Sequence, residues 1–243
     1  MSKGILGIGD SFMWGESLYF YSDLPNLPFN ENHKFDFDTM TEGFIGYKNK
    51  HRFIQLVADY YDTWCNVRAL NGSTNESNLN FINQFNYTDV IQPNDTNDFN
   101  FKLDINEYKL VIFIFTSHIR DKSEHLINDV LKEADTVFSR FEEMGIKVCT
   151  LCWYPEWFNT DIYRHYYVNK NRHTPLIHNN KIHNWYEDLC YNNYYKLSIK
   201  SDFAKKGFQK NDMHFNKQGN KMLAESIIKK LNQEKFTINN NLI

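Results

Sequence analysis

The sequence predicts an α/β fold, in which a mostly parallel sheet lies between two layers of helices as a three-layer α/β/α sandwich. Short apolar runs typical of buried strands alternate with longer segments whose apolar residues recur at helical spacing. The chain has 243 residues, which suits one large domain with its own core. No internal repeat divides it. We therefore expect a single domain over residues 1–243.

The first expected strand lies near the N-terminus, where Ile5, Leu6 and Ile8 stand among glycines. It runs into a tight turn at Asp10 and Ser11, followed by residues that can start a helix. A serine on such a turn presents its hydroxyl at the carboxyl edge of the sheet, near the N–H groups of a helix N-terminus. Ser11 is therefore a candidate nucleophile, with a helix-capping turn as the alternative. Asp10 is expected to fix this turn without taking a catalytic step.

Further elements follow in alternation. We expect a helix over residues 51–62 and a short strand over residues 63–70, which ends in a polar loop at residues 71–75. Residues 76–107 are polar and rich in Asn, and are expected to hold one helix and a surface loop.

The clearest strand is KLVIFIF at residues 109–115, a continuous apolar run typical of a central parallel strand. A long amphipathic helix is expected from Ser123 to Met144, with Gly145 as its stop, and a strand over residues 146–153. A second amphipathic helix over residues 217–231 closes the fold.

Two long segments, residues 19–50 and 154–190, are rich in aromatic residues. Connections of this length often form lids or pocket walls, and we expect both to be insertions that shape a binding site.

Composition narrows the classes of function. The net charge is −3 and the basic residues are dispersed, which argues against a nucleic-acid or anionic-membrane surface. The first residues already form a strand, leaving no room for a signal peptide, and no apolar run reaches transmembrane length. A cytoplasmic protein without membrane or nucleic-acid partners is expected. The abundance of Asn, Tyr, Phe, Ile and Lys fits an AT-rich genome, such as a viral one.

No metal or cofactor is expected. Cys149 and Cys152 form a C-x-x-C, but residues three apart on a strand point to opposite faces of the sheet. His173, His178 and His183 recur at five-residue spacing, which gives no common helical face, and we expect them to be solvated loop residues.

A loop ahead of the last helix carries Asp212 and His214. A serine nucleophile needs a base for its proton and a group that orients the base. An Asp and a His this close can hydrogen-bond each other, although a solvated loop is the simpler interpretation of the pair alone.

These motifs together resemble the SGNH (GDSL-type) hydrolases. The shared pattern is Gly-Asp-Ser at the first strand, Gly72 after the second, a polar turn after the third, and Asp-Met-His-Phe-Asn-x-x-Gly near the C-terminus. The resemblance implies a flavodoxin-like sheet, no metal or organic cofactor, and action on esters or thioesters. By position, Ser11 matches the nucleophile and first oxyanion N–H donor, Gly72 the second donor, and His214 the general base.

The acid of this pattern departs from the family's commonest form, Asp-x-x-His, which would place the orienting residue at Asn211. Here the acid is one residue nearer, as in the shorter form of some relatives. We assign the role to Asp212, because an Asn stabilises an imidazolium poorly.

The third block also departs from the family's Gly-x-Asn-Asp, because the chain has Thr116-Ser117-His118-Ile119. The third oxyanion donor is therefore open. The hydroxyl of Ser117 or the N–H of His118 is favoured, the Thr116 hydroxyl is a further candidate, and Asn75 is a weaker one.

The leading hypothesis is a serine esterase that cleaves a carboxylic ester, such as a carbohydrate O-acyl or O-acetyl ester, through an acyl-enzyme on Ser11. An O-acyltransferase is one alternative. A non-catalytic binding or structural module with a degenerate site is the other. The expected partner is a small-molecule or glycan ester, and the oligomeric state is not predicted.

Overall fold

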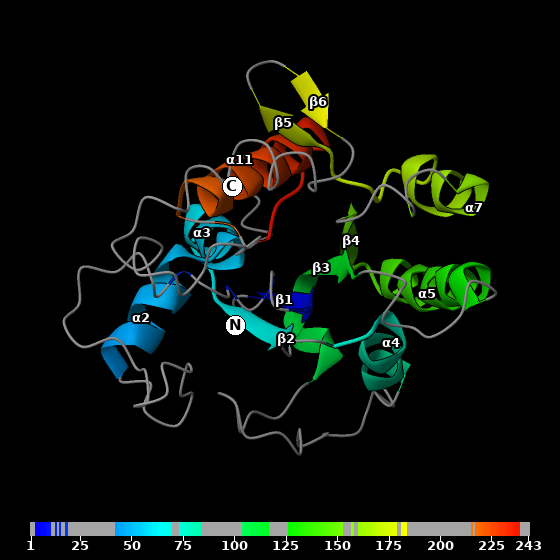
Figure 1. Cartoon of the computed structure of the whole chain (residues 1–243), viewed down its shortest axis with the longest axis horizontal. Coiled ribbons are helices and arrows are strands. Elements are labelled where there is room, and N and C mark those ends of the chain that lie inside the picture. Colours follow the sequence, from blue (N-terminus) through cyan, green and yellow to red (C-terminus); the bar gives the residue numbers. More distant parts are fainter. Residues whose placement is uncertain are drawn as a thin grey trace, which may run out of the picture.

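The structure is a computed structural model that describes residues 3–10, 13, 15, 18, 42–69, 73–83, 104–116, 126–152, 157, 160–178, 181–183, 215 and 217–238. Within these ranges, a four-stranded sheet lies between two layers of helices, and a two-stranded hairpin lies next to the C-terminal helix (Figure 1).

The sheet is parallel throughout. Its strands are β1 (Gly4–Gly9), β2 (Cys65–Ala69), β3 (Tyr108–Phe115) and β4 (Lys147–Cys152), in the order β2-β1-β3-β4. A flavodoxin-like sheet has this order through its fourth strand. The predicted fold class is confirmed, and each of these four strands begins and ends within two residues of its expected position.

One face of the sheet is covered by α3 (Phe53–Tyr60) and α11 (Lys217–Gln233), with α2 (Glu42–His51) leading into α3 (Figure 1). Ile5, Ile112 and Leu151 belong to the apolar core on this side. The core is continuous because alternate strand residues point to one face.

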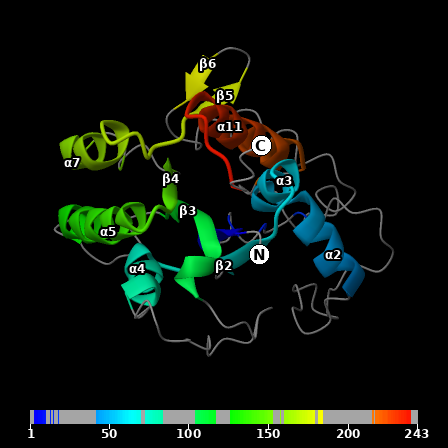
Figure 2. The same cartoon turned by 180° about the vertical axis from the view of Figure 1, so that it is seen from behind.

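The other face is covered by α4 (Asn75–Asn83) and α5 (Leu126–Glu143), as the reverse view also shows (Figure 2). A short turn, α7 (Asp161–Tyr163), continues as the π-helical η5 (Arg164–Val168) beside α5. The 3-10 turn η3 (Ile105–Glu107) leads into β3. None of the described helices is long and apolar enough to cross a bilayer.

The two cysteines of the C-x-x-C lie on opposite faces, as predicted. Cys149 belongs to the core beneath α3 and α11, and Cys152 to the core beneath α5. Both are buried thiols, and burial raises the pKa of Cys149 to about 11. The Cys149 thiolate, the form that reacts and binds metals, is therefore disfavoured.

Beyond β4, the chain adds one parallel bridge at the position of a fifth strand. The N–H of Thr150 donates to the carbonyl of Arg172 at 2.8 Å, and the N–H of Thr174 donates to the carbonyl of Thr150 at 2.9 Å. The chain then forms the antiparallel hairpin β5 (Leu176–His178) and β6 (Lys181–His183) next to α11 (Figure 1).

The two expected insertions contain regular structure where they are described. Residues 42–50 belong to α2, and residues 160–183 contain α7, η5 and the hairpin. The remainder of residues 19–50, and residues 184–190, lie outside the described residues, and a role as lids stays a prediction. The helix predicted over residues 51–62 is α3, which begins at Phe53 and ends at Tyr60. Its buried side is formed by residues 53, 54, 57 and 58, and the side chain of Tyr60 is 56% exposed.

Candidate active site

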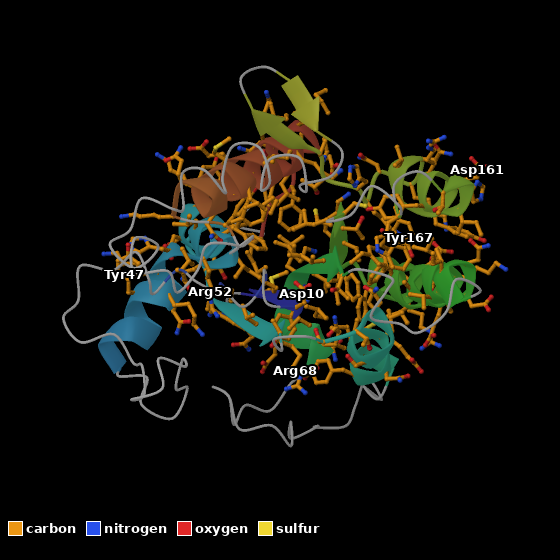
Figure 3. All side chains as sticks on the ribbon, in the orientation of Figure 1. Asp10, Tyr47, Arg52, Arg68, Asp161 and Tyr167 are labelled. Carbon is orange, nitrogen blue, oxygen red and sulfur yellow. The ribbon has the colours of Figure 1, made fainter. Side chains whose placement is uncertain are left out.

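The candidate site is built at the carboxyl edge of the sheet. Because β1, β2 and β3 are parallel, the chain leaves all three strands at this edge. Asp10 follows β1 directly, Thr116 follows β3 directly, and Ser73 lies a short distance beyond β2. All three residues are buried, and Asp10 lies near the middle of the molecule (Figure 3).

Thr116 joins these segments through several hydrogen bonds. Its hydroxyl donates to Oδ2 of Asp10 at 2.7 Å. Its backbone N–H donates to Oδ1 of Asn75 at 2.8 Å, and its carbonyl accepts from Nδ2 of Asn75 at 3.0 Å. The Asn75 side chain thus pairs with one peptide group as a neighbouring strand would.

The loop after β2 is tied to β1 as well. The hydroxyl of Ser73 donates to the carbonyl of Gly9 at 2.9 Å, so the residue after Gly72 is anchored to the last residue of β1. At the start of α4, the backbone N–H of Thr74 donates to the hydroxyl of Ser77, and the backbone N–H of Ser77 donates to the hydroxyl of Thr74. These two hydrogen bonds fix the end of the loop.

Trp157 completes the cluster from the segment after β4. Its indole N–H donates to the carbonyl of Thr116 at 2.7 Å, and its side chain is fully buried against Phe115. Sequence reasoning missed Trp157, because no periodic pattern surrounds it and nothing in the sequence pairs it with residue 116.

The start of α11 also lies at this edge. Its last turn is near the amino end of the sheet, because Nζ of Lys147, the first residue of β4, lies 2.7 Å from Oε2 of Glu234. A helix of 17 residues extends about 25 Å, so its first turn reaches the carboxyl edge. There Nδ2 of Asn220 donates to the carbonyl of Phe215 at 3.1 Å, and Oδ1 accepts from the N–H of Phe53 at 2.9 Å.

Most predicted site residues lie outside the described residues: Ser11, Gly72, Ser117, His118, Asp212 and His214. Four of them are direct sequence neighbours of described, buried residues. Asp10 precedes Ser11, Ser73 follows Gly72, Thr116 precedes Ser117, and Phe215 follows His214. The flanks of all four motifs therefore belong to one edge of the sheet, and the assigned roles stay predictions.

Asn75 is described and is fully buried. An amide side chain has one oxygen and two N–H groups, and here the oxygen and one N–H bind the Thr116 peptide. This contact gives Asn75 a structural role at the edge, whereas its weak assignment as an oxyanion donor stays a prediction.

One expectation about histidines is wrong. His173 is buried and is not a solvated loop residue. It forms the bridge to β4, and its N–H donates to the carbonyl of Tyr167 in η5 at 3.0 Å. Its Nδ1 lies 3.0 Å from the hydroxyl of Tyr163. Burial, aided by the nearby charge of Lys230, lowers the pKa of His173 to about 3, so the ring is neutral at pH 7. His178 and His183 lie on the hairpin, paired with Lys181 and Leu176.

Within the described ranges, no group of three or more His, Cys, Asp or Glu residues is arranged to hold a metal ion. A groove of about 810 Å³ runs along the outer side of α3 and α11. Leu56, Ala224 and Ile228 contribute apolar lining, and its lining also includes His51 and Lys217, at the end of α2 and the start of α11.

No protein-family model matches the sequence, and no curated protein matches it. Solved structures do, and three of them are 11–12% identical to this chain. An esterase, EstA, from Pseudoalteromonas sp. is 11% identical, with a TM-score of 0.48 and coverage of 96% of this chain and 98% of that one. A member of the lipolytic G-D-S-L family from Veillonella parvula is 11% identical, with a TM-score of 0.38 and coverage of 93% and 96%.

A family two carbohydrate esterase from Clostridium thermocellum is 12% identical, with a TM-score of 0.44 and coverage of 96% of this chain but 64% of that one. Of these three structures, two are thus described as esterases and one as a member of the lipolytic G-D-S-L family.

Proposed function

We propose that this protein is a serine ester hydrolase of the SGNH type, with Ser11 as nucleophile. One observation carries the proposal: the residues flanking the four sequence motifs, Asp10, Ser73, Thr116 and Phe215, all belong to the carboxyl edge of the sheet. In open α/β sheets this edge is where ligands bind. Motifs that are far apart in the sequence thus have flanks that the fold brings together.

The proposed reaction has two stages. His214, oriented by Asp212, takes the proton of the Ser11 hydroxyl as the oxygen attacks the ester carbonyl. The C–O bond to the alcohol breaks, and the alcohol leaves with the proton from His214. Water then attacks the acyl-enzyme with His214 again as base, which releases the carboxylic acid and restores the Ser11 hydroxyl.

The backbone N–H groups of Ser11 and Gly72 would stabilise the oxyanion, with Ser117 or His118 as the third donor. Losing one such donor typically lowers the rate on the order of a hundredfold, which slows an enzyme without abolishing its activity. The missing Asn of the third block is therefore compatible with catalysis.

The aromatic segments 19–50 and 154–190 favour a substrate with a sugar ring or an acyl group, because aromatic walls suit both. A carbohydrate O-acyl ester is the substrate class we would screen first, with acetyl esters ahead of longer acyl groups.

The test is intact-mass analysis after treatment with a fluorophosphonate, which reacts with activated serines. We expect one adduct on the wild-type protein and none on Ser11→Ala or His214→Ala. Ser226→Ala is the matched control, since it removes a buried hydroxyl from the middle of α11 and should keep the adduct. A folded wild-type chain that forms no adduct would refute the esterase.

Two other functions remain as alternatives. An O-acyltransferase would form the same adduct, and it would be recognised by acyl transfer to a sugar hydroxyl in competition with water. A non-catalytic module is favoured by the departure at Thr116-Ser117-His118 and would form no adduct.

A further inference from the structure

We propose that Thr116 is the positioning residue of the nucleophile turn, and that it acts through the carboxylate of Asp10. The assignment rests on the proposed function, because it concerns the turn that carries Ser11. It adds a residue that the shared sequence motifs do not assign, at a position where the family pattern has Gly.

The Asp10 carboxylate requires a partner where it lies. Its residue is 1% exposed, and a buried carboxylate is costly unless hydrogen bonds compensate for lost water. The Thr116 hydroxyl donates to Oδ2 at 2.7 Å. Asp10 is covalently joined to Ser11, so a fixed Asp10 side chain restricts the peptide that leads into the nucleophile.

Thr116 is itself held rigidly. Its N–H and carbonyl are both bound by the Asn75 amide, and the carbonyl also accepts from the Trp157 indole. Threonine is β-branched, and its side chain has few rotamers. The hydroxyl is therefore presented to Asp10 from a fixed peptide group, with the segments after β2, β3 and β4 all contributing to its position.

The same hydrogen bond argues against Thr116 as an oxyanion donor, which the sequence had left open. A hydroxyl has one hydrogen to donate, and here Oδ2 of Asp10 accepts it. Donation to a substrate oxyanion would require breaking the bond to Asp10 at the moment of reaction. Thr116 therefore acts on the geometry of the turn and does not touch the substrate.

The expected cost of losing this contact follows from how rates depend on alignment. A displacement of about 1 Å of a reacting group can lower a rate about a hundredfold. We expect Thr116→Val, which keeps the shape but removes the hydroxyl, to slow fluorophosphonate labelling of Ser11 about 10- to 100-fold. With a nitrophenyl acetate substrate, kcat should fall by the same factor while KM changes less than threefold.

Three comparisons separate positioning from a general loss of structure. Thr116→Ser restores the hydroxyl and should label within about threefold of the wild type. Thr150→Val removes a hydroxyl from an equally buried threonine on β4 and should label at the wild-type rate. In a chain that already carries Asp10→Ala, adding Thr116→Val should change the labelling rate less than threefold, because contacting residues that act as a unit are not additive.

If Thr116→Val does not fold by circular dichroism, Asp10→Asn is compared with Asp10→Ala. The Asn oxygen can still accept from Thr116, so Asp10→Asn should label at least tenfold faster. Equal labelling of wild type and Thr116→Val, or of Asp10→Asn and Asp10→Ala, would overturn the assignment alone. Absence of labelling on the folded wild type would overturn the proposed function and this assignment with it.

Discussion

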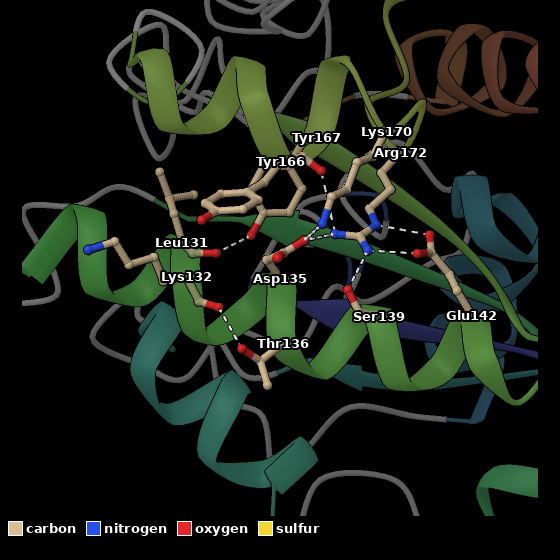
Figure 4. A network of polar contacts seen from close by, with 10 residues as sticks. All are labelled: Leu131, Lys132, Asp135, Thr136, Ser139, Glu142, Tyr166, Tyr167, Lys170 and Arg172. Atoms are coloured by element: carbon tan, nitrogen blue, oxygen red, sulfur yellow. Dashed lines mark hydrogen bonds and ion pairs between the residues drawn. The ribbon is translucent and has the colours of Figure 1, made fainter.

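Arg172 holds Glu142 in a two-point ion pair, with Nε donating to Oε1 at 2.9 Å and Nη2 donating to Oε2 at 2.6 Å (Figure 4). The same guanidinium contacts Asp135 and donates to the hydroxyl of Ser139. Arg172 lies just after η5, and its partners lie on α5, so the network attaches the segment that follows β4 to one helical layer.

Arg172→Met should destabilise the protein by about 3 kcal/mol, because Glu142 loses both of its hydrogen bonds from the guanidinium, while Asp135 retains its pair with Lys170. The Arg172 side chain is 1% exposed, so water does not replace it. Urea unfolding followed by circular dichroism measures the change. Arg164→Met is the control, because its pair with Asp161 is exposed and long, and its unfolding midpoint should not move. An equal midpoint for both variants would contradict a structural role of the network.

His173 makes stability depend on pH. Burial lowers its pKa to about 3 in the folded state, and an unfolded His titrates near 6.5. Above pH 6.5 the ring is neutral in both states. Between pH 6.5 and 3 the unfolded state binds a proton that the folded state does not. The free energy of unfolding therefore falls by about 1.4 kcal/mol for each unit by which the pH is lowered.

Urea unfolding at pH 7, 6, 5 and 4 tests this dependence. In His173→Gln, the slope of the free energy of unfolding against pH should be smaller by about 1.4 kcal/mol per pH unit, whatever the stability of the variant at pH 7. Parallel curves for wild type and His173→Gln would show that His173 is not the group responsible.

The strands and long helices could be predicted because local sequence determines them. The apolar run at residues 109–115 suits a strand buried on both faces, and the structure extends it by Tyr108 alone. Gly145 has φ of +75°, a conformation that suits glycine, which is why it marked the end of α5 correctly.

The features that the sequence did not predict depend on contacts between segments that are distant in the chain. The burial of His173 follows from the bridge to Thr150. Arg172 is buried against α5, where Asp135 and Glu142 each lie about one turn from Ser139 and bind the guanidinium. Neither partner is visible from the local sequence. At the candidate site, the motif residues were recognisable by type and order, whereas the role of Thr116 required its bond to Asp10.

Gly7 on β1 and Gly46 on α2 should respond in opposite ways to Ala. A Cβ at Gly7 would lie 2.3 Å from Cδ1 of Ile54 and 2.7 Å from Sδ of Met13, inside the core. Gly7→Ala should therefore destabilise the protein by about 1–3 kcal/mol. Gly46 is exposed on a helix, and a Cβ there meets nothing within 4 Å, so Gly46→Ala should stabilise by about 0.5–1 kcal/mol. Thermal unfolding measures the change in stability of both variants. A more stable Gly7→Ala variant would contradict the packing of β1 against α3.

The identity of the residue that orients His214 can be decided by a matched pair of variants. Under the proposed function, Asp212→Asn keeps the shape but removes the charge that stabilises the imidazolium, and kcat should fall about 10³- to 10⁴-fold. Asn211→Ala should change kcat less than threefold, because the commoner spacing of the motif is not used here. The variants are compared by ester hydrolysis across pH 6–9, with folding checked by circular dichroism. A large loss at Asn211 together with a small one at Asp212 would assign the orienting role to Asn211 and would place this chain with the Asp-x-x-His spacing, with an amide where the acid stands.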